Sequence, residues 1–172
     1  MKTLLATIIL ALAAPAAAQP YLYLAPSAST VQAAGISDSS SAPYIAAGWQ
    51  FGAVALEASH VDTGSASGAS RTWSASGPGL AVLGTVPIGA KFSLLGKLGA
   101  YWLNSERMDV GPPRTSATVT RAELGARPAI GIGVLYARHP RLQLRAMLEQ
   151  VDGTGELERL RLVTVGAVVV FP

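Results

Sequence analysis

The chain has 172 residues, of which 50% are hydrophobic, 13% are charged and none is cysteine, and its formal net charge is +3. Soluble domains carry about 25% charged residues, so the chain has roughly half of the usual charged fraction. Its apolar content excludes intrinsic disorder. The absence of cysteine excludes disulfides, thiolate metal sites and cysteine nucleophiles. Either a partner or a lipid phase must therefore cover the apolar excess.

The first residues have the pattern of a secretory signal peptide. Lys2 supplies a positive start, residues 4–12 form an apolar run, and residues 16–18 are all alanine. The run is shorter than the ~20 residues that a membrane-spanning helix needs, so a membrane anchor fits less well. The sequence therefore predicts a signal peptide over residues 1–18, cleaved after its last alanine, and one exported domain over residues 19–172.

Along the rest of the chain, apolar residues alternate with polar or small ones. The clearest alternating stretches are residues 45–51, 53–59, 92–102, 121–136, 141–149 and 163–171. Two stretches are less regular: residues 20–26 are apolar on both faces, and residues 71–85 are interrupted by Gly77-Pro78-Gly79. Because proline cannot donate to a strand ladder, this interruption predicts a β-bulge. A period of two indicates strands, and the sum is eight predicted strands.

The two faces of these stretches differ in chemistry. Between residues 121 and 136 one face carries Ile130, Ile132 and Val134, whereas the other carries Arg127 and glycines. Backbone groups in lipid must all be paired, so only helices and closed barrels cross membranes, and no second apolar run is long enough for a helix. We therefore predict an all-β fold: an eight-stranded antiparallel up-and-down transmembrane β-barrel with its apolar face outward.

The connections between the predicted strands alternate in length. Residues 27–43, 62–70 and 104–120 are long connections and residues 152–156 a moderate one, whereas residues 50–52, 87–90 and 138–141 are tight. Outer-membrane barrels have short periplasmic turns and longer external loops. The alternation therefore predicts external loops at the first four segments and both chain ends on the periplasmic side.

Aromatic residues fall near the predicted strand ends, as an interfacial girdle requires. Tyr44 and Tyr101 are expected toward the long connections. The other predicted girdle members are Trp49, Phe51, Trp73, Phe92, Trp102, Tyr136 and Phe171.

Several of these stretches together resemble one family. The motifs are Gly48-Trp49-Gln50-Phe51-Gly52 with Ala55-Leu56-Glu57, then Lys97-Leu98-Gly99, residues 128–136, Leu144-Arg145 with Glu149, and residues 165–171 ending in Phe171. In this order they resemble the OmpA-like family of eight-stranded outer-membrane barrels. The resemblance implies location in the outer membrane of a Gram-negative bacterium and insertion by the barrel-assembly machinery. Pro172 departs from the family pattern, in which the aromatic residue is usually last.

The inward face predicts a network of paired charges. Its members are Glu57, Lys97, Arg121, Glu123, Arg127, Arg145 and Glu149. Eight strands leave a lumen that side chains can fill, and an unpaired buried charge costs several kcal/mol. We therefore expect the network to plug the lumen, with a narrow solute pore as the alternative; proteins that the chain resembles hold such a network.

Other function classes fit less well. His60 lies near Ser59 and Asp62, but adjacent residues of a strand point to opposite faces, so no catalytic residue and no enzymatic activity are predicted. Two histidines and no cysteine predict no metal site and no cofactor. A soluble periplasmic ligand-binding barrel would need the apolar face inward, and an eight-stranded barrel has too small a lumen for so many large side chains.

The expected partners follow from the location. They are outer-membrane lipids and, during biogenesis, the barrel-assembly machinery, for a chain that is monomeric. Arginines alternate along strands and form no patch, so nucleic acid is not expected. The small polar residues of 37–41 and 64–70 leave a surface adhesin open as an alternative role.

Overall fold

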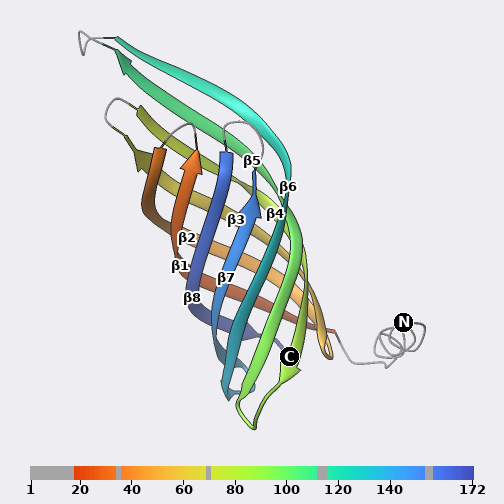
Figure 1. Cartoon of the computed structure of the whole chain (residues 1–172). Helices are drawn as coiled ribbons and strands as arrows, with labels where there is room; N and C mark the ends of the chain where they lie inside the picture. The colour runs from red at the N-terminus through yellow and green to blue at the C-terminus, as the bar shows by residue number, and fades with distance from the viewer. Residues whose placement is uncertain (1–17, 34–35, 69–70, 112–115, 154–156) are drawn as a thin grey trace.

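The structure, a computed structural model, describes residues 18–33, 36–68, 71–111, 116–153 and 157–172 and forms a closed antiparallel barrel (Figure 1). The strands are β1 (Gln19–Ala33), β2 (Ile36–Phe51), β3 (Val54–Ser67), β4 (Arg71–Pro87), β5 (Phe92–Gly111), β6 (Ser116–His139), β7 (Leu142–Asp152) and β8 (Leu157–Val170). Each strand pairs with its neighbours in the chain, and β8 closes the barrel against β1. The predicted fold class and strand number are confirmed. Within the described ranges no helix is long and apolar enough to cross a membrane.

Both ends of the described barrel lie together, because Tyr21 near the start of β1 pairs with Val170 at the end of β8. The predicted signal peptide, up to residue 17, lies outside the described residues. The three predicted tight turns are confirmed: they fall between β2 and β3, β4 and β5, and β6 and β7. Gly52 occupies the first of these turns with a φ of 61°, a conformation that favours glycine.

The predicted long loops are wrong in large part, because most of their residues continue the strands. β1 and β2 pair as far as Ala33 and Ile36, and β5 and β6 pair as far as Gly111 and Ser116. A ladder of backbone hydrogen bonds needs no apolar face once the strands have left the membrane. Hydroxyl contacts between strands also help, as between Ser29 and Ser40, whose Oγ atoms are 2.9 Å apart.

The bulge predicted at Gly77-Pro78-Gly79 is also wrong, since β4 keeps an unbroken register with β3 and β5 through these residues. The two glycines serve close packing instead: a Cβ on Gly79 would collide with the ring of Tyr101, its partner in β5. The register shifts elsewhere, between Asp62 and Ser65 and opposite Gly125. Gly64 and Gly125 have φ angles of 65° and 69°, which is typical of glycine in a bulge.

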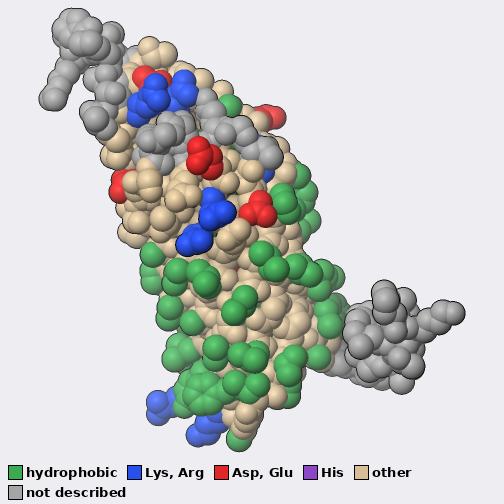
Figure 2. Space-filling view, in the orientation of Figure 1, with side chains coloured by type: hydrophobic (Ala, Val, Ile, Leu, Met, Phe, Trp, Pro, Cys, Tyr) green, Lys and Arg blue, Asp and Glu red, His purple; other side chains and the backbone are tan. Residues whose placement is uncertain are grey.

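The apolar side chains face outward and form a belt around the lower part of the barrel. Ile132 and Leu144 are 66% and 53% exposed, whereas Glu149 is 1% exposed. This confirms the predicted facing and contradicts the alternative of a barrel that turns these apolar faces inward. In Figure 2 hydrophobic side chains cover the lower part of the visible face, and most charged side chains gather above it.

The upper edge of the belt is a ring with one outward polar residue on each strand. Its members are Thr30, Ser41, His60, Ser76, Asn104, Glu123, Gln150 and Arg161. Below the ring, the outward positions of β8 are apolar from Val163 to Phe171. That stretch measures about 26 Å along the strand and about 20 Å along the barrel axis at a tilt near 40°. This height is close to the roughly 25 Å apolar band of outer-membrane barrels.

The belt predicts a position-dependent cost of charge on β6. Ile130→Arg places a guanidinium against lipid and should lower the free energy of unfolding by about 2–4 kcal/mol. Val119→Arg is the matched control, because Val119 is 49% exposed on the outward face of the same strand but above the ring. Reversible denaturation in lipid vesicles measures both. Equal stability of the Ile130→Arg variant and the wild type would show that the face assignment is wrong.

Candidate functional site

Four of the seven predicted lumen residues meet inside the barrel. Glu57 on β3, Lys97 on β5, and Arg145 and Glu149 on β7 all point inward, and none is more than 3% exposed. Since β3 and β7 lie on opposite walls of the eight-stranded barrel, contacts between them cross the lumen. We call these four residues the lumen cluster.

The lumen cluster is a chain of alternating charges. Arg145 binds Glu57 through two bonds, Nη1 to Oε2 at 2.6 Å and Nη2 to Oε1 at 3.1 Å. Lys97 Nζ lies 3.2 Å from Glu57 Oε1 and 2.9 Å from Glu149 Oε2. Paired, hydrogen-bonded charges are the form in which ions are tolerated inside a protein, and a bidentate arginine–carboxylate pair is among the strongest. The formal charges of the four groups sum to zero.

Tyrosines donate further hydrogen bonds to the two carboxylates. Tyr21 donates to Glu57 Oε2 at 2.9 Å, and Tyr101 donates to Glu149 Oε2 at 2.7 Å. Each phenol comes from a strand other than that of its acceptor, so each bond also ties two strands together.

Tyrosines also surround the two cations. Lys97 Nζ donates to the hydroxyls of Tyr44 and Tyr101 at 2.8 and 3.1 Å. Arg145 stacks on Tyr23, with its guanidinium carbon 3.7 Å from the ring centre. The expectation that Tyr44 and Tyr101 face the membrane interface is therefore wrong. The signal that would have found them is the same period of two, since both share a face with residues of the lumen cluster.

Glycines make room for this cluster and for the tyrosines around it. A Cβ on Gly48 would collide with the phenol of Tyr21, and one on Gly131 would stand 2.9 Å from Cγ of Glu149. The large side chains of the cluster therefore extend over the bare backbone of neighbouring strands.

Arg121 and Glu123 do not join the lumen cluster, so their prediction is corrected. The bulge at Gly125 inserts one residue into β6, and Glu123 therefore pairs with Asn104 on the outward face. Arg121 likewise points outward, where its Nη2 lies 3.4 Å from Oε1 of Glu106 with both side chains exposed. Arg127 follows the bulge along β6, so it keeps its inward position opposite Tyr101, and it is half-buried.

The predicted girdle needs one further correction. Trp73 is fully buried inside the barrel, because β4 extends to Arg71 and its odd positions face inward. The other six predicted members occupy outward positions: Trp49, Phe51, Phe92, Trp102, Tyr136 and Phe171. Phe92 and Tyr136 stack near the short turns, with ring centres 4.9 Å apart.

Above the lumen cluster the interior is lined mainly by apolar side chains, with the buried hydroxyls of Ser29, Thr63 and Ser105 among them, and the sequence did not reveal this layer. Val31, Val61, Leu103, Leu160 and Leu162 are all buried there. The signal was present, because these residues continue the inward period of their strands. Val31 lay in a predicted loop, and the other four lay between the alternating stretches and the predicted loops. Side chains thus fill the barrel both at the charged level and above it.

Above the polar ring, side chains connect β2 and β3. Asp38 Oδ2 accepts a hydrogen bond from the Ser67 amide and Oδ1 accepts one from the Ser39 amide, both at 2.8 Å. The Ser40 hydroxyl donates to the Thr63 carbonyl. The amides of Ser67 and Ser39 hold the pKa of Asp38 below its usual value, because they stabilise the carboxylate.

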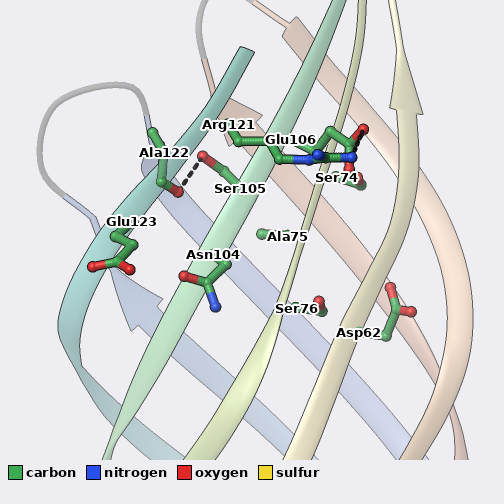
Figure 3. A pocket seen from close by; sticks show the side chains of 10 residues that line it. All are labelled: Asp62, Ser74, Ala75, Ser76, Asn104, Ser105, Glu106, Arg121, Ala122 and Glu123. Atoms are coloured by element: carbon green, nitrogen blue, oxygen red, sulfur yellow. Dashed lines mark hydrogen bonds and ion pairs between the residues drawn. The ribbon is translucent and has the colours of Figure 1, made fainter. Parts of the chain in front are cut away.

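A polar groove of about 620 Å³ lies on the outer side of β3 to β6, just above the belt (Figure 3). Asp62, Asn104, Glu106, Arg121 and Glu123 line it with serines from β4. Within the described ranges, no group of three or more histidine or acidic residues is placed to hold a metal ion. His60 faces outward and Ser59 inward, so these two do not form a nucleophile and its base.

The chain is similar to known barrel proteins in sequence pattern and in fold. The family model described as OmpA-like transmembrane domain matches residues 27–164. The structure of Ail, the attachment invasion locus protein of Yersinia pestis, matches with a TM-score of 0.63 and 16% identity over 90% of this chain and 99% of that chain. Neisserial surface protein A (NspA) matches with a TM-score of 0.66 and 15% identity over 88% and 97%.

The outer membrane protein OprG from Pseudomonas aeruginosa matches with a TM-score of 0.58 and 12% identity over 90% of this chain and 96% of that chain. At such identities these likenesses concern the fold. Comparison with curated protein sequences finds no match.

The lumen cluster predicts a large cost for breaking one of its pairs. Glu57→Gln removes the charge that holds both Arg145 and Lys97, and should lower the free energy of unfolding by about 3–5 kcal/mol. Glu106→Gln, which breaks the exposed pair with Arg121, is the matched control and should cost less than about 1 kcal/mol. Denaturant titration in detergent micelles measures both. Similar costs for the two variants would mean that the cluster is not a buried network.

The contact between β2 and β3 predicts a pH response. A depressed pKa means that the Asp38 carboxylate stabilises the folded state at every pH above the usual pKa of an aspartate. This stabilisation is lost as the pH falls through the lower pKa of the folded state. The Ser67 amide resonance should therefore titrate with a midpoint below that of an ordinary aspartate, and Asp38→Asn should abolish the titration. NMR in nanodiscs measures it. A midpoint at or above the ordinary value would contradict the pairing.

Proposed function

This chain belongs to the OmpA-like transmembrane domain family, and from that premise we propose that it is a non-conducting outer-membrane barrel that presents an ordered β-sheet at the cell surface. The chain is an outer-membrane barrel by family and fold. The proposal adds three points: export by the signal peptide of residues 1–18, a lumen sealed by side chains, and a surface role for the strands above the membrane.

The observation that carries the sealed lumen is the ion pair between opposite walls. Glu57 on β3 and Arg145 on β7 approach to 2.6 Å, so their side chains span the interior at that level. Lys97 from β5 binds the same carboxylate and links it to Glu149. Opening a path for solutes would require separating these charges in a water-poor interior, where each unpaired ion costs several kcal/mol.

The surface role is supported by the strands that continue above the polar ring. β5 extends from Asn104 to Gly111 beyond the ring, and β6 begins at Ser116, ahead of its ring residue Glu123. Long external segments of barrels are usually loops, whereas here they form a paired sheet with a polar outer groove (Figure 3). A sheet held in one conformation presents side chains and backbone groups to a partner with little ordering cost.

The remaining expectations belong to the same proposal. We propose no enzymatic activity, metal or cofactor, since the described chain offers neither a catalytic set nor a metal-ligand group. Outer-membrane lipids cover the belt, the barrel-assembly machinery inserts the chain, and the barrel works as a monomer.

Conductance tests the sealed lumen. The purified protein in a planar lipid bilayer should show no steady current, because the lumen cluster and the apolar layer fill the interior. The double variant Glu57→Ala with Arg145→Ala removes the pair between the walls and should leak more than the wild type, provided that its heat-modifiable gel mobility shows a folded barrel. A steady, charge-selective current through the wild type would overturn the proposal and favour the narrow pore.

A further inference from the structure

The extracellular part of β6 is paired on one side. On one side β6 pairs with β5, from Ser116 opposite Gly111 to Tyr136 opposite Phe92. Its pairing with β7 begins only at Ala129, opposite Val151. Among the described strands none pairs with residues 116–128 of β6 on the side away from β5. All side chains of residues 118–123 are exposed, and Figure 1 shows this hairpin rising beyond the neighbouring strands.

One hydrogen bond shows which backbone groups face this open edge. Ser105 on β5 lies directly opposite Ala122, and its hydroxyl donates to the Ala122 carbonyl at 3.2 Å. The peptide groups of Ala122 therefore point toward β5. Since these groups alternate along a strand, the N–H and C=O groups of Arg121 and Glu123 point away from β5, to the open edge.

The features of β6 that would prevent pairing at its open edge lie below residues 116–123. Edges are commonly blocked by proline, bulges or short length. In β6, Pro128 and the bulge at Gly125 lie just above the first residue that pairs with β7. Residues 116–123 precede both and read Ser-Ala-Thr-Val-Thr-Arg-Ala-Glu, a sequence with β-branched residues and no proline. This segment can therefore accept another strand.

We propose that residues 117–123 of β6 bind an extended segment of another protein as an added antiparallel strand, and that this segment carries a basic-x-acidic pattern. The proposal rests on the surface role above and names its partner. Main-chain hydrogen bonds provide the affinity in such pairing, and side chains provide the selectivity.

Charge complementarity determines the pattern. The residues of the added strand directly opposite Arg121 and Glu123 lie on the same outer face, where opposite charges stabilise and like charges destabilise. In an antiparallel strand the residue opposite Glu123 comes first, so it is basic and the residue opposite Arg121 is acidic. Ala122 between them faces the close, non-hydrogen-bonded pair, where its small side chain leaves room for a larger one.

The polar groove extends this site. Arg121 and Glu123 line its β6 side together with Asn104 and Glu106 (Figure 3). Outer side chains of the added strand would therefore lie beside these polar groups, with Arg121 between Glu106, 3.4 Å away, and the acidic residue of the partner.

A synthetic peptide with the sequence Thr-Val-Thr-Arg-Ala-Glu-Leu is a suitable probe, because it carries the basic-x-acidic pattern. Fluorescence anisotropy measures its binding to the full chain in nanodiscs. A peptide with its arginine and glutamate exchanged should bind about tenfold more weakly. In the variant Arg121→Glu with Glu123→Arg the preference should invert, which a merely unfolded hairpin cannot produce.

Backbone methylation tests the strand geometry without altering the protein. N-methylation of the peptide's arginine and glutamate blocks the amides that would face β6 and should abolish binding, whereas N-methylation of the intervening alanine should leave it. Absent binding, equal binding of the two methylated peptides or an unchanged charge preference would each overturn the proposal. A dimer of the chain without peptide, lost in Arg121→Pro, would overturn it by assigning the edge to a second copy. None of these outcomes depends on conductance, so the peptide experiments test the added strand on β6 and leave the proposal of a sealed lumen to be tested separately.

Discussion

A carboxylate and a guanidinium that meet across a narrow lumen are the contact on which the interior of this barrel depends. Glu57 and Arg145 come from opposite walls and bind through two hydrogen bonds, and Lys97 ties the same carboxylate to Glu149. Neither ion could remain there alone, because desolvation would cost more than any packing gain at that position. Phenols add hydrogen bonds to the carboxylates and to Lys97, and bare glycine backbone leaves room for the large side chains, so that side-chain size and charge agree at one level of the barrel.

The outer surface obeys the opposite requirement. Lipid offers no hydrogen bonds, so the wall must close on itself and present apolar side chains. The period of two in the sequence serves both requirements at once, since each step along a strand moves a side chain from lipid to lumen. At the upper edge of the belt, every strand carries one outward polar residue. Inside the barrel, buried apolar residues continue above that level.

Alternation therefore predicted the barrel, the tight turns and the four residues of the lumen cluster. It failed where one residue breaks the period. The bulge at Gly125 turns Arg121 and Glu123 outward. The sequence alone does not distinguish a glycine that forms a bulge from one that makes room for a neighbouring side chain, as Gly79 makes room for Tyr101. Trp73, Tyr44 and Tyr101 were misplaced because small polar residues near them favour loops by composition, whereas backbone pairing extended the strands instead.

The direction of the side chains is the central claim, and contacts between side-chain methyl groups and lipid acyl chains test it most directly. Nuclear Overhauser effects can be recorded on the methyl-labelled wild-type protein in nanodiscs. Ile132 and Leu144 should show effects to acyl-chain protons, and Leu83 and Val168, at 3% and 4% exposure within the barrel, should show none. Acyl-chain effects at Leu83 and Val168 but not at Ile132 and Leu144 would contradict the account.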